Sequence, residues 1–397
     1  MKELTAIRQK IDLIAECIFA KIQNIEEESF GLYSGEFGLL LFLLYYSKYS
    51  KNKKHISLTE DYAERLLEQF VNGTRLHTFC DGFSGILYLF EFLRENDFLD
   101  MDVNYAQPVL DNFLVSRMRQ DIRQQNYDFM HGALGVGLYF LKKGLYSEYI
   151  QELIDFFYDT AEKDEDSQFF KWRSVVDPEE NFTGYNLALS HGIPSIIIFL
   201  SRIIKSDSTN EKVMKMLSGA VNYVLSQQKD FLQFGSYFPN YIIQSSPETI
   251  SKSRLAWCYG DLGIGMALWQ AGKAIDKTEW KDKGLDILLQ STIRRNYNED
   301  FVVDTGICHG SASIALIYRR IYLETHREEF KEATLYWISQ TLDLSHFEDG
   351  LAGYKTYLAS GWECNYALLM GISGIGLVLL SYLEGDEQAW DEMLLLS

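Results

Sequence analysis

The apolar positions of the chain form two kinds of segment that alternate along its length. The first kind is a run of aliphatic and aromatic residues that follows a Gly-x-x-Gly turn or a near variant, as in SGEFGLLLFLL from Ser34 and MGISGIGLVLL from Met370. Successive turns are 47 to 68 residues apart, which fits one helical hairpin and its connections per repeat. The first glycines of the seven turns are Gly35, Gly82, Gly132, Gly192, Gly260, Gly310 and Gly371.

The second kind of segment is charged and amphipathic. Residues 62–70 and 280–289 carry apolar side chains at intervals of three and four, which is typical of a helix with one buried face. The runs after the glycines are apolar on nearly all sides, as expected of helices buried between an outer layer and a common centre. The pattern therefore predicts an all-α fold, an α/α toroid with seven inner and seven outer helices.

The repeats also predict how the chain is organised. No linker-like stretch interrupts them, so residues 1–397 are expected to form a single domain. Glycine at the head of each turn tolerates a positive φ and lets backbones approach closely, so the turns are expected to lie together at one end of the ring. Two longer polar connections, residues 164–181 and 233–253, are expected to shape a rim or lid.

Charge and cysteine content exclude several classes of protein. The chain has 37 Lys and Arg against 56 Asp and Glu, a formal net charge of −19, and no dense basic cluster. It therefore lacks the charge of a nucleic-acid-binding protein, and an anionic membrane surface would repel it. Its five widely spread cysteines do not form a disulfide framework and favour a reducing cytoplasm.

Two segments bear on whether the chain carries a targeting signal or a membrane span. The first residues alternate charged and apolar side chains at helical spacing, which is not the pattern of a secretory signal. Residues 364–383 are uncharged over the length that a membrane span needs. Asn365, Ser373 and the repeat pattern favour a buried helix there, and a membrane-spanning protein is not expected.

Chemistry is expected just before the first glycine of each turn, because those positions face one shared basin if the turns lie together. Cys258 stands two residues before Gly260, and Cys308 and His309 occupy the two positions before Gly310. Two thiolates and one imidazole suit Zn²⁺, and three protein ligands leave one coordination position open, as in catalytic zinc sites. The alternative is two small buried cysteines and a hydrogen-bonded core histidine, but the shared repeat position favours the metal site.

Other polar side chains stand near the glycines of the remaining repeats. His191 directly precedes the glycine of its turn, and Asp128 lies four residues before the glycine of another. Arg254 lies four residues before Cys258, and Tyr259 follows Cys258. Together they offer acid–base capacity and a fixed positive charge. Each also has a structural alternative: Asp128 can cap a helix, Arg254 can form a surface ion pair, and His191 can bind a backbone carbonyl.

At these motifs the chain resembles the lanthionine synthetase C-like proteins, the cyclases of lantibiotic biosynthesis. Two repeats depart from the family pattern, because Ser195 and Ser313 stand where a second glycine is usual. The resemblance implies the double ring of helices and one zinc ion per chain, held by Cys258, Cys308 and His309. It spans essentially the whole chain and rests on SRLAWCYGDLGIG with Cys258, ICHGSAS with Cys308 and His309, ALSHGIPS with His191, and YDFMHGALG with Asp128.

The activity that the resemblance implies is zinc-dependent peptide cyclisation. A cysteine thiolate of a dehydrated precursor peptide would add to dehydroalanine or dehydrobutyrine in the same peptide, closing a lanthionine or methyllanthionine thioether ring. By resemblance, His191 and Asp128 transfer protons, with His191 as the donor to the enolate. Arg254 would contribute charge and positioning, and Tyr259 would support them. Expected partners are the precursor peptide, a dehydratase and an exporter, with the protein in the cytoplasm, peripherally associated with a membrane-bound synthetase complex.

Two other functions were weighed against the cyclase. A zinc-containing relative could bind peptide or glutathione, or add glutathione to dehydroamino acids, without closing a ring. The presence of both Asp128 and His191 favours catalysis over binding alone. A toroidal glycosidase would need paired carboxylates, whereas the turns offer one aspartate and several thiols.

Overall fold

The computed structural model describes the chain except for residues 1, 25–28, 100–105, 145–147, 165, 167, 178–181, 244–249 and 386–388. The chain divides into two compact units. Unit 1 comprises Met1–Leu114 and Val302–Trp390, and unit 2 comprises Val115–Phe301 and Asp391–Ser397.

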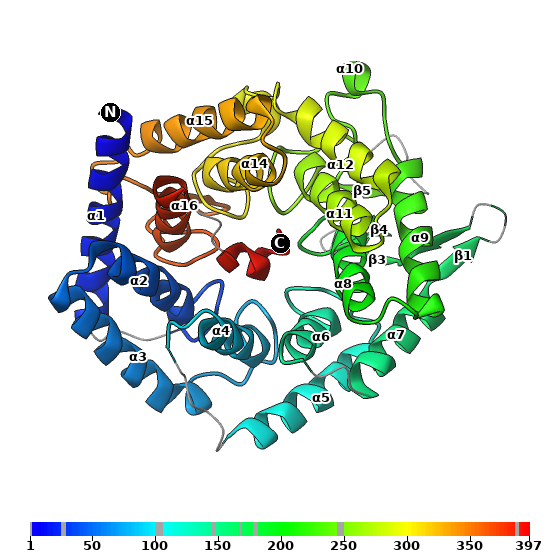
Figure 1. The fold of residues 1–397 in the computed structure, drawn as a ribbon, viewed down its shortest axis with the longest axis horizontal. Coiled ribbons are helices and arrows are strands. Elements are labelled where there is room, and N and C mark those ends of the chain that lie inside the picture. Colours follow the sequence, from blue (N-terminus) through cyan, green and yellow to red (C-terminus); the bar gives the residue numbers. More distant parts are fainter. Residues whose placement is uncertain are drawn as a thin grey trace. The chain divides into compact units, whose positions relative to one another are not determined.

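Unit 1 is built from paired helices. α2 packs against α3, α14 against α15 and α16 against α1, while α16 also contacts α2 and α14 (Figure 1). An antiparallel hairpin of β6 and β7 lies between α15 and α16 in the sequence. The elements are α1 (Lys2–Gln23), α2 (Glu36–Ser50), α3 (Lys53–Gly73), α4 (Phe83–Glu95), α14 (Ser311–Thr325), α15 (Glu328–Asp343), β6 (Thr356–Leu358), β7 (Gly361–Glu363) and α16 (Ile372–Glu384).

Unit 2 repeats this pairing and adds short strands. α6 packs against α7, α8 against α9 and α11 against α12, and α8 also contacts α6 and α11. Its helices are α5 (Gln107–Arg123, which begins in unit 1), α6 (Ala133–Lys142), α7 (Glu148–Thr160), α8 (Ile193–Ser206), α9 (Glu211–Ser226), α10 (Phe231–Phe234), α11 (Asp261–Ala274), α12 (Thr278–Ser291), α13 (Tyr297–Asp300) and the 3₁₀ helix η2 (Ala389–Leu394, which begins in unit 1). Its strands are β1 (Glu162–Asp164), β2 (Phe169–Lys171), β3 (Ser174–Asp177), β4 (Phe182–Asn186) and β5 (Tyr241–Ile242).

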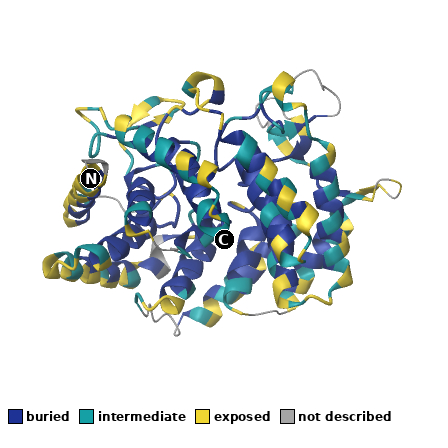
Figure 2. Ribbon diagram, turned by 45° about the horizontal axis from the view of Figure 1, so that its top comes forward, coloured by how far each residue is buried: buried dark blue, intermediate teal, exposed yellow. Residues whose placement is uncertain are grey.

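The two kinds of helix that the sequence predicts are both present. An inner helix follows each turn glycine directly, namely α2, α4, α6, α8, α11, α14 and α16. In α14 every residue from Ser311 to Ile321 is buried, whereas α12, an outer helix, buries five of its 14 residues. The exposed residues of Figure 2 lie mainly along the outer helices and the connections. The predicted amphipathic segments 62–70 and 280–289 fall within α3 and α12.

The apolar stretch 364–383 contains the buried helix α16, as predicted, but the helix begins only at Ile372. Cys364, the first residue of this stretch, lies exposed just after β7 and outside the helix. Among the described residues, no helix is both long and apolar enough to cross a membrane.

The turn glycines correct part of the sequence interpretation. Six of the seven have an extended backbone with φ between −135° and −105°, and Gly260 alone has a positive φ, of 91°. Close backbone contact is the general reason for glycine: a Cβ on Gly35 would lie 2.1 Å from the carbonyl oxygen of Ser29. In the same way, a Cβ on Gly371 would lie 2.3 Å from the carbonyl oxygen of Asn365. A methyl group would therefore force the turn open.

Backbone hydrogen bonds join the turns of unit 1 at one repeated position, two residues before the glycine. The N–H of Tyr33 donates to the carbonyl of Cys80 at 2.9 Å, and the N–H of Leu369 donates to the carbonyl of Tyr33 at 2.9 Å. The N–H of Cys308 then donates to the carbonyl of Leu369, also at 2.9 Å. The prediction that turns lie together is confirmed for these four turns.

The two serines that replace the second glycine keep the turn intact. The Oγ of Ser195 donates to the carbonyl of Gly192 at 2.7 Å, and the Oγ of Ser313 donates to that of Gly310 at 3.1 Å. Each hydroxyl thus binds the turn it follows, and the departure from the pattern needs no rearrangement.

The short strands were not predicted from the sequence. The connection 164–181 contains the second strand of an antiparallel hairpin, in which Glu162 pairs with Lys171, and it also contains β3. β3 is an edge strand of a three-stranded sheet with the order β3-β4-β5. Parts of both predicted rim or lid segments, residues 165, 167, 178–181 and 244–249, lie outside the described residues. Their role as a rim or lid stays a prediction.

Candidate functional site

The turn before α14 positions Cys308 and His309 in unit 1. Asp304, six residues before Gly310, closes this turn because its Oδ1 accepts from the N–H of Gly306 at 3.1 Å. The carbonyl of Asp304 also accepts from the N–H of Ser311 at 3.0 Å. The hydrogen bond from Cys308 to the neighbouring turn fixes the segment further, so both side chains have a defined place.

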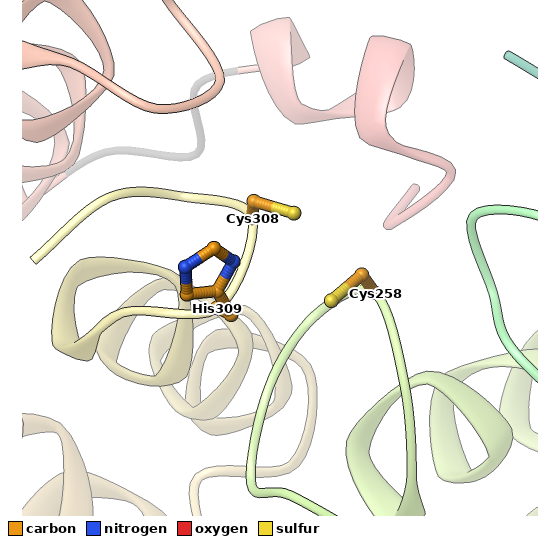
Figure 3. A group of neighbouring side chains, drawn as sticks. All are labelled: Cys258, Cys308 and His309. Carbon is orange, nitrogen blue, oxygen red and sulfur yellow. The ribbon is translucent and has the colours of Figure 1, made fainter. Parts of the chain in front are cut away.

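The second carboxylate oxygen of Asp304 faces His309. Asp304 is 2% exposed, and its Oδ2 accepts from the N–H of Tyr357 at 3.0 Å and lies 3.6 Å from Nε2 of His309. In Figure 3 the other ring nitrogen of His309 lies on the side of the Cys308 sulfur. One ring nitrogen of His309 therefore lies near the carboxylate of Asp304, and the other points toward the side of Cys308.

Aspartate at this position differs from its counterparts in three other turns. Asn126, Asn186 and Asn365 stand six residues before their glycines, and each side-chain oxygen accepts from the backbone N–H two residues later. The cap therefore requires only one oxygen, which an asparagine supplies. The second oxygen of Asp304, where asparagine has an amide nitrogen, accepts from the N–H of Tyr357 and faces His309.

The turn before α11 carries Cys258 in unit 2, as drawn in Figure 3. Cys258 is 4% exposed, and its carbonyl accepts from the N–H of Ser190 at 3.4 Å and from its Oγ at 3.3 Å. The preceding residue, Trp257, is fully buried, and its indole N–H donates to the carbonyl of Leu394 at 2.8 Å. The C-terminal segment therefore binds the residue next to Cys258, a contact that the sequence pattern does not predict.

A buried ion network anchors both ends of the segment that carries Arg254 and Cys258. Nε of Arg294 donates to Asp300 at 2.9 Å, and its Nη1 donates to Asp261 at 3.2 Å. Nη2 of Arg294 donates to the carbonyl of Ser253 at 2.5 Å. The sequence pattern does not reveal this role of Arg294, because an arginine after an amphipathic helix resembles a surface residue and only its burial shows the network.

Asp128 and His191, which are 63 residues apart in sequence, meet in unit 2. Oδ2 of Asp128 lies 2.7 Å from Nδ1 of His191, and its Oδ1 accepts from the N–H of His131 at 2.8 Å. Burial lowers the pKa of His191, but the hydrogen bond and charge of Asp128, with a contribution from Cys258, hold that pKa above its ordinary value. Asp128 therefore stabilises the protonated ring of His191 relative to that of a free histidine.

Tyr259 lies beside this pair, whereas Arg254 is not placed in contact with it. The rings of Tyr259 and His191 have centroids 6.5 Å apart, and the ring of His131 stacks on His191 at 5.9 Å. Asp128, His191 and Tyr259 together line a cavity of about 470 Å³ in unit 2. Arg254 is half-buried outside the cavity lining, and the described residues provide no hydrogen-bond or ion-pair partner for its guanidinium.

Comparisons with known proteins agree on one fold. A solved structure of nisin cyclase is similar to 98% of this chain and 97% of that chain, with a TM-score of 0.74 and 20% sequence identity. This similarity confirms the predicted all-α fold, an α/α toroid. The nisin biosynthesis protein NisC of Lactococcus lactis subsp. lactis is 22% identical over 396 residues, which cover 94% of this chain and 79% of NisC.

The family itself follows from the sequence. The model of the lanthionine synthetase C-like proteins matches residues 26–395, a range that holds all seven turns and every candidate residue above. The family expected from the four motifs is thus confirmed: this chain belongs to the lanthionine synthetase C-like proteins.

Proposed function

We propose that this protein is a zinc-dependent cyclase that closes lanthionine or methyllanthionine rings in a dehydrated precursor peptide. The observation that carries the proposal is the Asp128–His191 pair, which lines a cavity beside Tyr259. A paired, partly buried histidine in a cavity is suited to proton transfer. Membership of the family and similarity to NisC and nisin cyclase support the reaction class.

The residues proposed as metal ligands fit zinc by their chemistry. Cys258, Cys308 and His309 each offer one ligand atom, and each stands one or two residues before the first glycine of its turn. Two sulfurs and one imidazole nitrogen form a donor set that zinc accepts, and a fourth position would remain for substrate. Zn²⁺ bound there would lower the pKa of a coordinated substrate thiol, so that the thiolate forms at neutral pH.

The proposed catalytic residues would supply the proton that completes the addition. When the substrate thiolate bonds to the β-carbon of the dehydro residue, the alkene electron pair moves to the α-carbon and its carbonyl as an enolate. His191 would donate the proton that this enolate takes at the α-carbon, through Nε2, because Asp128 occupies Nδ1. The proton released from the substrate thiol balances the one consumed. Tyr259 would support this step.

Two further residues have proposed positioning roles. The guanidinium of Arg254 is half-buried and would place a fixed positive charge near the substrate carbonyl, which favours an enolate. Asp304 would hold the His309 ring so that Nδ1 is presented to the metal, as carboxylates commonly do for metal-binding histidines.

The proposed setting follows from the reaction. The substrate is a dehydrated precursor peptide, so a dehydratase must act first, and the mature product then requires an exporter. We place the protein in the cytoplasm, where thiols stay reduced, in association with a membrane-bound synthetase complex. All of residues 1–397 are proposed to act as a single domain.

Metal content and ring formation test the proposal together. The purified protein should contain one zinc per chain without added metal, and Cys308→Ala should lose it. Cyclisation of a synthetic peptide with one dehydroalanine and one cysteine is mass-neutral, so we would measure the loss of the alkylatable thiol by mass spectrometry. The variant should leave the thiol free.

The matched control is Cys364→Ala, which removes an exposed cysteine outside the turns. It should retain zinc and ring formation. Zinc retained in Cys308→Ala, or rings formed at the same rate without zinc, would refute the proposal. If the wild type adds glutathione to the peptide but closes no ring, the protein is a glutathione transferase of this family instead.

A further inference from the structure

The cavity that holds Asp128 and His191 is lined by two segments of consecutive residues. One is the segment 124–128, which follows α5 and includes Asp128, and the other is the segment 174–176 of strand β3. Asn186, His191 and Tyr259 complete the lining. The cavity therefore borders both β3 and the proposed proton donor, and we refer to it as the β3 slot.

The edge of strand β3, rather than one of its faces, borders this slot. Successive side chains of a strand point to opposite faces, so a cavity on one face would be lined by alternate residues. Ser174, Val175 and Val176 all line the slot, which indicates that the backbone edge faces it. β3 is the edge strand of its sheet, with β4 as its only neighbour among the described strands.

A register shift leaves one residue of this edge outside the sheet pairing. Val175 pairs with Thr183 and Asp177 with Phe182, so Val176 has no partner in β4. Such a bulge frees the backbone groups of the extra residue from the ladder. Val176 therefore lies on the edge strand, in the lining of the slot, without a paired residue in β4.

The segment after α5 contributes two exposed polar side chains to the lining. Gln124 and Gln125 are exposed, and the described residues provide no hydrogen-bond partners for their side-chain amides. Primary amides both donate and accept, as a peptide backbone does. Val175 of β3 adds apolar surface, since it is 52% exposed. The slot thus combines a strand edge, free amides and one apolar side chain, which together suit an extended peptide.

We propose that the β3 slot binds the substrate peptide in an extended conformation, as an added strand that pairs with the edge of β3 at Val176. The inference rests on the proposed function and deepens it, because the bound segment comprises the residues that neighbour the dehydro residue. Strand addition derives affinity from the peptide backbone and selectivity from pockets for alternate side chains. About 470 Å³ is within the usual range of ligand-binding cavities.

The test combines a protein variant with a modified peptide. Val176→Pro removes the N–H of the bulged residue, which has no ladder partner in β4. The probe is a synthetic ten-residue peptide with alanine for the dehydro residue and serine for the cysteine, so that it binds without reacting. Fluorescence anisotropy should show a Kd about tenfold higher for the variant, as expected for one lost backbone hydrogen bond.

Methylation of the peptide amides next to the alanine provides the second arm. Methylated peptides should bind the wild type about tenfold more weakly, and at least one of them should show no further loss with Val176→Pro, because both changes remove the same pairing. Glu328→Pro is the matched control, since it introduces proline at the first position of α15, on an exposed residue, where proline fits a helix. It should leave the Kd unchanged.

The outcomes separate this inference from the proposed function. If the wild type closes rings but neither Val176→Pro nor amide methylation changes the Kd, the β3 slot is not the peptide site and the cyclase assignment stands. If the peptide binds with the predicted sensitivities but no ring forms in the reactive version, the slot stands and the cyclase assignment fails. Failure of the wild type to bind the unreactive peptide overturns the inference, and so does additive loss for every methylated peptide.

Discussion

Two histidines that occupy the same place in their repeats have a carboxylate beside different ring nitrogens. His191 stands directly before Gly192, and His309 stands directly before Gly310. Asp128 contacts Nδ1 of His191 at 2.7 Å, whereas Asp304 lies 3.6 Å from Nε2 of His309. The repeat position is shared, and the nitrogen that the carboxylate engages differs.

This difference fits the two proposed roles, proton transfer at His191 and metal binding at His309. A carboxylate on Nδ1 leaves Nε2, the outer nitrogen, for proton exchange with a substrate. A carboxylate on Nε2 leaves Nδ1, close to the backbone, for a metal beside the adjacent Cys308. The two carboxylates also come from different places: Asp304 lies in the same turn as its histidine, and Asp128 comes from another repeat.

The largest effect is expected from removing His309, the histidine of the proposed metal site. His309→Ala leaves two thiolates without the imidazole, so we expect loss of stoichiometric zinc and of ring formation. Elemental analysis of the protein, purified without added metal, gives the zinc content per chain. A full complement of zinc in this variant would show that His309 is a structural histidine, and the contrast with His191 would disappear.

The next largest effect is expected from removing His191, the proposed proton donor. His191→Ala should retain zinc while kcat for cyclisation falls by about 10²- to 10⁴-fold, the usual contribution of a positioned acid. His131→Ala is the control, because it removes a ring at the equivalent position but keeps the backbone N–H that binds Asp128. It should have a much smaller effect on kcat. Equal losses in the two variants would argue against a specific role for His191.

A smaller effect sharpens the comparison at Asp304. Asp304→Asn keeps the oxygen that caps the turn, as Asn365 does in its own turn, but removes the charge beside His309. We expect zinc affinity to fall about 10- to 100-fold, measured by competition with a chelator. The converse variant, Asn365→Asp, adds a charge at the same position of another turn and should leave the affinity unchanged. Unchanged zinc affinity in Asp304→Asn would show that Asp304 only caps its turn.

The smallest effect is a shift in pH dependence. Asp128 raises the pKa of His191, and activity that needs the protonated ring should be lost as pH rises through that raised value. Asp128→Asn removes the charge and lowers the pKa, so the alkaline loss of kcat should move to lower pH. A pH–rate profile of both proteins checks this, and an alkaline limb at the same pH in both would exclude His191 as the titrating acid.

The repeat, and the features that depend on its period, follow from the amino-acid sequence alone. Glycine at the turns, apolar runs after them and amphipathic segments between them predict inner and outer helices, because helix period and close backbone contact are local requirements. The repeat register also placed Cys258, Cys308 and His309 at matching positions. The expectation that the turn glycines are needed for a positive φ holds only for Gly260 among the seven.

Which side chains meet depends on how the helices pack. The contact of Asp128 with His191 joins different repeats, and no spacing in the sequence specifies which nitrogen it engages. The burial of Arg294 and the hydrogen bond from Trp257 to Leu394 are equally invisible in a pattern of hydrophobicity. Periodicity reports which face of an element is buried, whereas a site depends on contacts between residues that are remote in sequence and become neighbours only when the helices pack.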